Sequence, residues 1–194
     1  MKRGIINRVS KGIFSLKRIR PFTPEIDSKL KSLHKKIIKE FPFLELCLWN
    51  TSILNEFTIH QTNQNFIMVE VEKGAAKSIF IFLKEQNMNV FFKPSKEVFD
   101  RYITENEDTI IVKSLITEAP VINTKSGNTV SLEKVLVDIF CDDIIFTAYQ
   151  GNEMKTIYKN AISKYSLNQG KLLRYASRRG KKEEIKDFTN QIYS

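Results

Sequence analysis

The 194-residue sequence is 42% hydrophobic and has a net charge of +9, with 31 Lys and Arg against 22 Asp and Glu. This length and composition fit one packed domain, or a domain with an appendage, and exclude a disordered chain. The apolar runs are too short to cross a membrane, and no signal-peptide core follows the basic N-terminus. Together with two isolated cysteines, Cys47 and Cys141, this predicts a cytoplasmic protein that has no disulfide and does not contact a membrane.

The positive charge is concentrated in two segments, which contain no acidic residue and carry +7 and +6, so that the other 162 residues sum to −4. The N-terminal basic segment (residues 1–20) contains Lys2, Arg3, Arg8, Lys11, Lys17, Arg18 and Arg20. The C-terminal basic segment (residues 171–182) contains Lys171, Arg174, Arg178, Arg179, Lys181 and Lys182. Such segments favour an anionic partner, either nucleic acid or an acidic protein face, with solvated surface charge as the alternative.

The chain begins with a predicted β-hairpin over residues 2–16, in which Gly12 occupies a loop position that needs positive φ. A linker with two prolines follows. A helix is then expected from Pro24 to Phe41, with Thr23 as its N-cap and a Lys-rich outer face.

The middle of the chain alternates between strand and helix patterns. Strands are predicted at residues 44–49, 65–72, 89–92 and 109–115, with helices over residues 75–83 and from Ser95 between them. This order indicates a sheet with covering helices and some parallel pairing, followed by a turn or hairpin around Gly127.

The last third is predicted to be helical. Ser131 is the expected N-cap of a helix whose apolar residues recur at 3.6-residue spacing, and Gly180 is the expected end of a later one. We therefore predict an α/β (α+β) protein: a mixed β-sheet with covering helices, an N-terminal β-hairpin and a helical C-terminal third. Residues 1–22 form the basic hairpin and linker, and residues 23–194 form the main domain.

The sequence contains none of the common catalytic motifs, and His34 and His60 have no neighbours at metal-ligand spacing. One set of three carboxylates remains as an alternative catalytic site. Glu70 and Glu72 alternate on a predicted strand and, with Glu56, could bind a divalent metal as in restriction-type nucleases. In such nucleases a Lys usually follows the acid by two residues, but Glu72 occupies that position. The simpler interpretation is a strand end that reaches solvent, so we expect no catalytic residue, metal or cofactor.

Candidate nucleic-acid contacts are the seven cations of the N-terminal basic segment, because Arg8 and Lys11 lie near a hairpin turn from which they could reach phosphates. Further contacts with nucleic acid or a protein partner are expected from Arg174, Arg178, Arg179 and Lys181. Tyr175 lies among them and is interpreted as a core aromatic, with base stacking as the alternative.

Three segments resemble the AbiEi-type antitoxins of bacterial type IV (abortive infection) toxin–antitoxin systems. The stretch "GIINRVSKGIFSL" is similar to the wing of that family's winged helix, where G-x-I-x-R-V-x-[RK]-G-x-[YF] is common. "VSLEKVLVDIFCD" is similar to a helix of the family, and "LNQGKLLRYASRRGK" is similar to its Tyr-Ala-x-Arg-Arg tail. The three occur in the family's order across most of the chain.

The resemblance implies a transcriptional regulator and antitoxin that opposes a nucleotidyltransferase toxin without needing a stable complex with it. The helices that precede the wing in the family would lie before Met1, so we expect non-specific DNA contact rather than base reading. Leu132, Leu136 and Tyr175 are expected to be structural, and Glu133, Lys134 and Asp138 to be either scaffold groups or surface contacts. A plain nucleic-acid-binding module and the metal-dependent nuclease remain as alternatives.

Overall fold

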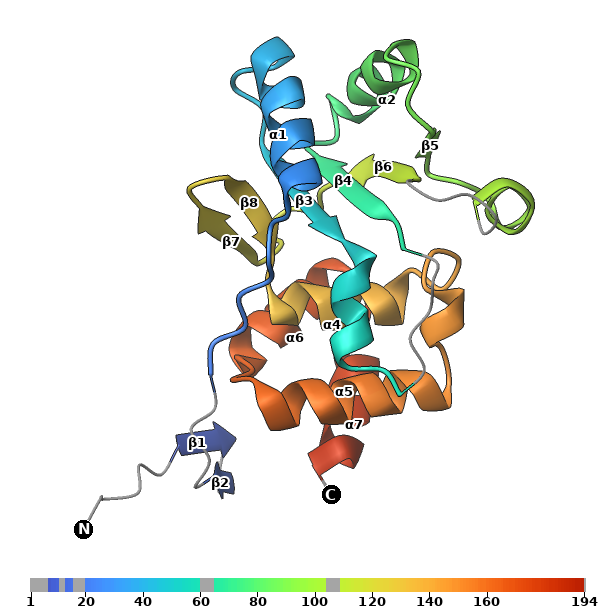
Figure 1. The fold of residues 1–194 in the computed structure, drawn as a ribbon. Helices are drawn as coiled ribbons and strands as arrows, with labels where there is room; N and C mark the ends of the chain where they lie inside the picture. The colour runs from blue at the N-terminus through green and yellow to red at the C-terminus, as the bar shows by residue number, and fades with distance from the viewer. Residues whose placement is uncertain (1–6, 11–12, 16–19, 60–64, 104–108, 194) are drawn as a thin grey trace.

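The computed structural model describes residues 7–10, 13–15, 20–59, 65–103 and 109–193. Over these residues the chain forms a six-stranded mixed sheet with helices on both faces, and a separate two-stranded sheet near the N-terminus (Figure 1). The predicted α/β class, with its helical C-terminal third, is confirmed.

The N-terminal elements agree with the sequence except at one helix boundary. β1 (Asn7–Ser10) and β2 (Ile13–Ser15) pair antiparallel as predicted, whereas Gly12 lies outside the described residues. α1 (Ser28–Glu40) begins later than expected. The cap is Asp27 rather than Thr23, because the Asp27 carboxylate accepts a hydrogen bond from the Leu30 amide at 2.7 Å.

The six-stranded sheet has the order β5-β6-β4-β3-β8-β7. Its strands are β3 (Leu46–Asn50), β4 (Ile67–Val71), β5 (Val90–Phe92), β6 (Ile110–Ser114), β7 (Val121–Thr124) and β8 (Gly127–Val130). β4, β6 and β5 run parallel, and β8 is parallel to β3, while β3–β4 and β7–β8 are antiparallel. The expected parallel pairing and the hairpin around Gly127 are therefore confirmed.

The connecting segments are short helices. η1 (Thr51–Glu56) follows β3, and α2 (Ala76–Glu85) links β4 to β5. α3 (Lys96–Val98) and the π-helical η2 (Phe99–Ile103) lie between β5 and β6.

The C-terminal third consists of α4 (Leu132–Cys141), η3 (Thr147–Tyr149), α5 (Asn152–Lys164), α6 (Gln169–Arg178) and α7 (Lys182–Tyr193). Ser131 caps α4 as predicted, since its hydroxyl oxygen accepts from the Lys134 amide at 3.3 Å. Gly180 has φ +70° directly after α6, which matches its predicted role at the helix end.

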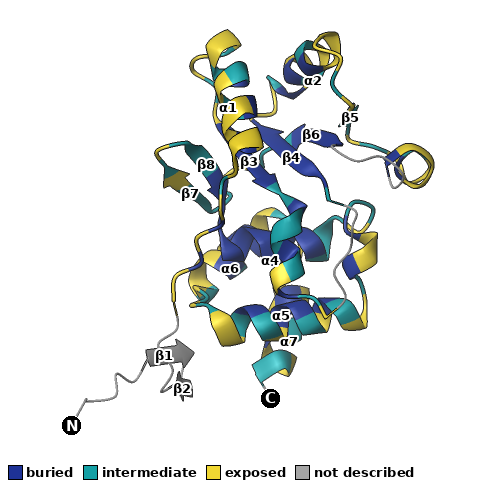
Figure 2. Cartoon of the chain, viewed as in Figure 1, coloured by how far each residue is buried: buried dark blue, intermediate teal, exposed yellow. Residues whose placement is uncertain are grey.

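The helices form two layers around the sheet (Figures 1 and 2). α1 and α2 cover one face, where their Leu and Ile side chains pack on alternate strand residues such as Ile67, Val69 and Val71. α4 to α7 lie on the other face, against Cys47, Trp49, Met68 and Ile111 among others. None of the helices in the described part of the chain is long and apolar enough to span a bilayer.

Candidate functional site

Glu70 lies inside the protein, which contradicts the expectation that the end of its strand reaches solvent. The Glu70 side chain is fully buried, and its Oε1 accepts hydrogen bonds from Trp49 Nε1 at 2.8 Å and from Lys134 Nζ at 2.6 Å. The position on β4 explains this placement, because Met68 and Glu70 point towards the layer that contains α4. Periodicity alone did not reveal it.

The three carboxylates considered as a nuclease site have different surroundings. Glu56 is exposed and accepts a hydrogen bond from the Tyr165 hydroxyl at 2.7 Å, while Glu72 lies beyond the end of β4 and is exposed. Within the described ranges, no three His, Cys, Asp or Glu side chains are grouped so that they could hold a metal ion. The nuclease alternative therefore gains no support from the geometry.

A second buried carboxylate, Asp138, joins α4 to α6. Its oxygens accept hydrogen bonds from Lys134 Nζ at 2.5 Å, from the Tyr175 hydroxyl at 2.8 Å and from Arg179 Nη1 at 3.1 Å. Tyr175 is fully buried, so the interpretation as a core aromatic is confirmed. Lys134 and Asp138 are four residues apart on one helix, and this spacing was the available sequence signal for the pair.

The ion pairs extend to Asp142, the C-cap residue of α4. Asp142 Oδ2 accepts from Lys113 Nζ at 2.5 Å, and its Oδ1 accepts from Arg179 Nη2 at 2.6 Å. The six side chains contain three cations and three carboxylates and are hereafter called the buried charge network: Glu70, Lys113, Lys134, Asp138, Asp142 and Arg179. Its charges balance, which is the condition for burying ions at tolerable cost.

The network keeps Asp138 and Lys134 charged. Burial by itself would raise the pKa of Asp138, but Lys134, Lys113 and Arg179 hold that pKa down at about 2. Burial would likewise lower the pKa of Lys134, yet Asp138 and Glu70 raise it well above its ordinary value. Glu70 Oε2 is buried and accepts no hydrogen bond from any described residue, and Lys113 Nζ lies 4.0 Å away from it.

The polar residues of α4 were expected to be either scaffold groups or surface contacts, and their burial decides between the two. Lys134 and Asp138 are fully buried and Glu133 is 7% exposed, so all three are scaffold groups rather than surface contacts. Leu132 and Leu136 are buried as well, in agreement with the structural role expected of them.

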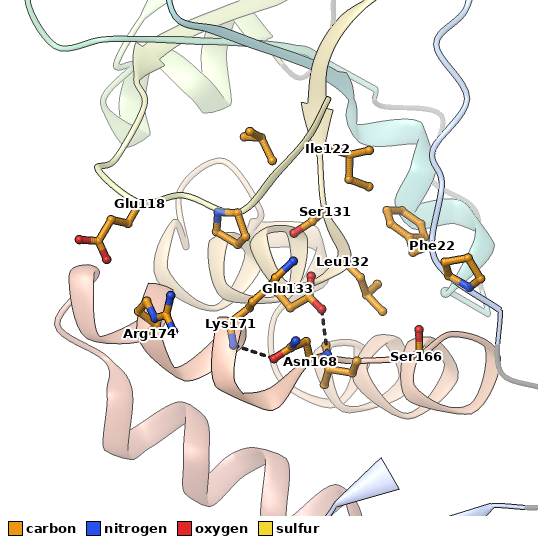
Figure 3. Close-up of a pocket in the computed structure, with 14 residues that line it drawn as sticks. Phe22, Glu118, Ile122, Ser131, Leu132, Glu133, Ser166, Asn168, Lys171 and Arg174 are labelled. Atoms are coloured by element: carbon orange, nitrogen blue, oxygen red, sulfur yellow. Dashed lines mark hydrogen bonds between the residues drawn. The ribbon is translucent and has the colours of Figure 1, made fainter. Parts of the chain in front are cut away.

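A groove of about 760 Å³ lies between the N-terminal linker and the start of α6 (Figure 3). Phe22 forms one side, where its ring packs edge-on against Tyr165 with 5.2 Å between ring centroids. The linker is fixed there by the backbone, since the Ser166 amide donates to the Arg20 carbonyl at 3.0 Å. The end of the N-terminal basic segment is thereby held beside the loop that leads into α6.

The opposite side of the groove carries Lys171 and Arg174 from the C-terminal basic segment (Figure 3). Both carboxylates of the groove are engaged: Glu133 accepts from the Asn168 amide at 2.8 Å, and Glu118 pairs with Arg178. Lys171 and Arg174, by contrast, are exposed and form no ion pair with any described residue. The groove thus offers two cations to an incoming anion.

Three further cations of the C-terminal basic segment are matched by carboxylates. Arg178 pairs with Glu118, and Lys181 Nζ lies 3.0 Å from Glu184. Arg179 is not a surface contact, because its side chain is 11% exposed and belongs to the buried charge network. The segment is therefore less available to a partner than its composition indicated, because Glu118, Asp138 and Asp142, distant in sequence, fold against two of its arginines and Glu184 pairs with Lys181 on the next turn.

The N-terminal candidates are only partly described. Arg20 is exposed at the end of the linker, and Arg8 lies on β1. The remaining candidates lie outside the described residues: Lys2, Arg3, Lys11, Lys17 and Arg18.

A protein-family model matches residues 1–194, the whole of the sequence, and its description is a family of unknown function, DUF6577. The chain belongs to this family. No curated protein matches the sequence.

Proposed function

We propose that this DUF6577 member is a non-enzymatic antitoxin and regulator of a bacterial type IV toxin–antitoxin system. It opposes a nucleotidyltransferase toxin and contacts nucleic acid through basic surface residues, without reading base sequence. No stable complex with the toxin is required.

The observation that carries the proposal is that the end of the N-terminal basic segment is fixed at the loop before α6, next to the groove that contains cations of the C-terminal basic segment. Arg20 and Tyr165 form a backbone bridge, and α6 begins four residues after Tyr165. Pro21 and Phe22, which directly follow Arg20, line the same groove as Lys171 and Arg174, although about 150 residues separate them in sequence. Cations gathered in this way favour a polyanionic partner.

The packing of α4 against α6 also supports the proposal. These helices contain two of the three segments that resemble AbiEi-type antitoxins, and they are joined by the hydrogen bonds of Asp138 to Lys134, Tyr175 and Arg179. Residues of these two segments therefore contact one another inside the protein, which gives the co-occurrence of the two segments in one sequence a physical reason.

Growth rescue tests the proposal directly. The chain is expressed together with the nucleotidyltransferase encoded beside it, and we expect growth to be restored relative to the toxin alone. Failure to restore growth, with the chain folded and expressed at the level of the toxin, would contradict the antitoxin role and leave a plain nucleic-acid-binding module.

The contribution of the groove is tested with Lys171→Gln combined with Arg174→Gln. We expect this pair to weaken binding to a DNA fragment several-fold at low salt, because two phosphate contacts are lost. Lys155→Gln with Lys159→Gln on α5, which are equally exposed, is the matched control and should leave binding unchanged.

A further inference from the structure

The outer side of α1 between Ser28 and Lys39 and the neighbouring β7–β8 hairpin form a surface without acidic residues, although the exposed Asp27 and Glu40 flank it at the two ends of the helix. Residues 28–39 and 121–130 contain no Asp or Glu. They contain six lysines, which define the lysine surface: Lys29, Lys31, Lys35, Lys36, Lys39 and Lys125. This concentration stands out because the chain outside the two basic segments sums to −4.

Three of these lysines lie in a line along α1. Lys31, Lys35 and Lys39 recur every four residues and lie opposite the buried Leu30 and Ile37. The outer side of α1 is exposed along its length (Figure 2). With a rise of about 1.5 Å per residue, the line extends for about 12 Å.

The hairpin is held against the same helix by a close contact. Gly127 has φ +111°, and a Cβ atom at this position would lie 2.3 Å from His34 Nε2, so only glycine fits there. This contact brings the hairpin turn that contains Lys125 beside α1. Burial lowers the pKa of His34, so the imidazole is neutral near pH 7 and the lysines supply the charge.

Four lysines of this surface form no ion pair with any described residue. Within the described part of the chain, Lys31, Lys35, Lys39 and Lys125 have no carboxylate within ion-pairing distance. The C-terminal basic segment differs, because Glu118, Asp138, Asp142 and Glu184 pair with three of its six cations.

We propose that the lysine surface binds the phosphate backbone of duplex DNA independently of base sequence. The proposal rests on the nucleic-acid contact proposed above and names a second surface for it. Unmatched cations along a straight helix complement the high linear charge density of a duplex. Single-strand binding surfaces add aromatic side chains on which bases stack. The two ranges that form this surface have no Phe, Tyr or Trp, and the 97% exposed Phe43 lies beyond them, between Glu40 and Glu45 in sequence.

The test is the salt dependence of binding to a short duplex of random sequence. The variant combines Lys31→Gln, Lys35→Gln and Lys39→Gln, since glutamine keeps helix propensity while removing charge. Each lost phosphate contact reduces the slope of log K against log salt by about 0.9, so we expect the slope to fall by roughly 2 to 3 and the affinity at low salt by at least about tenfold.

The matched control removes three exposed lysines elsewhere: Lys96→Gln, Lys155→Gln and Lys159→Gln. It should keep the slope and affinity of the unmodified chain. Thermal melting of both variants establishes that they fold.

Three results would overturn the inference. If the α1 variant binds like the unmodified chain while Arg8→Gln with Lys11→Gln loses binding, the DNA contact lies on the N-terminal basic segment and the proposed function stands. Tighter binding to single strands than to the duplex would contradict the chosen partner. If the unmodified chain binds no DNA at low salt, the lysine surface has another role, and growth rescue alone decides the antitoxin proposal.

Discussion

The two faces of the central sheet are stabilised in different ways, although the same strands supply both. On β4, Ile67, Val69 and Val71 point into an apolar layer under α1 and α2. Met68 and Glu70 alternate with them and point towards α4, where Glu70 meets Lys134. One face therefore depends on apolar contacts alone, and the other also contains six balanced charges.

This difference predicts which face of the sheet tolerates amino-acid substitutions better. An apolar contact is non-directional, and the loss of a methyl group costs little beyond the transfer and cavity energies. A buried ion depends on particular partners at particular distances, and removing one partner leaves the other charge in a medium that solvates it poorly. We therefore expect substitutions of similar size to have unequal effects on the two faces.

The largest effect is expected for Lys134→Met, which keeps the length of the side chain but removes its charge. Glu70 and Asp138 both lose their shortest cationic contact, and we expect the free energy of unfolding to fall by about 3–5 kcal/mol. Urea denaturation measures this change. Lys155→Met on the exposed side of α5 is the control, with an expected change within about 0.5 kcal/mol.

Adding Glu70→Gln to Lys134→Met tests whether the loss of stability comes from the uncompensated charge of Glu70. The double substitution removes one cation and one carboxylate, so it should recover part of the lost stability. If the double variant is less stable than Lys134→Met alone, the negative charge of Glu70 is not compensated by Lys134.

Lowering the pH is expected to have an intermediate effect on the free energy of unfolding. The pKa of Asp138 is about 2 in the folded protein and lies below its ordinary value of 3.8. The stabilisation from this group is therefore complete above about pH 4 and is lost as the pH falls towards 2, a change of roughly 2 kcal/mol. Denaturation curves across this range measure it.

Two variants separate Asp138 from the other carboxylates. Asp138→Asn should flatten the acid limb of the stability profile, whereas Asp143→Asn, at an exposed neighbouring position, should leave it unchanged. An acid limb that is equally steep in both variants would place the acid sensitivity elsewhere in the protein.

The smallest effect is expected on the apolar face. Ile37→Val removes one methyl group from a fully buried side chain of α1 and should lower the free energy of unfolding by about 0.5–1.5 kcal/mol. Because no titrating group is involved, the loss should be the same at pH 7 and at pH 3. A loss that changes with pH would mean that the two layers are coupled through the sheet.

The candidate site was only partly predictable. The sequence located the basic residues around the groove, because clustered Lys and Arg are visible without a fold. It did not show that Glu118 pairs with Arg178 or that Arg179 turns inwards, since these partners are about 40 to 60 residues away. The lysines of α1 were visible as a Lys-rich face, but the proximity of Lys125 depends on how Gly127 packs against His34.

The sequence by itself determined the element order, most element boundaries and the α/β class. These follow from local rules: apolar periodicity, the Ser131 cap and the glycines at positive φ are read within a few residues. The tertiary structure decided which charges are buried. Glu70, Lys134 and Arg179 have no local feature that distinguishes them from solvated residues, because the stability of a buried ion depends on partners that come together only when distant segments of the chain pack.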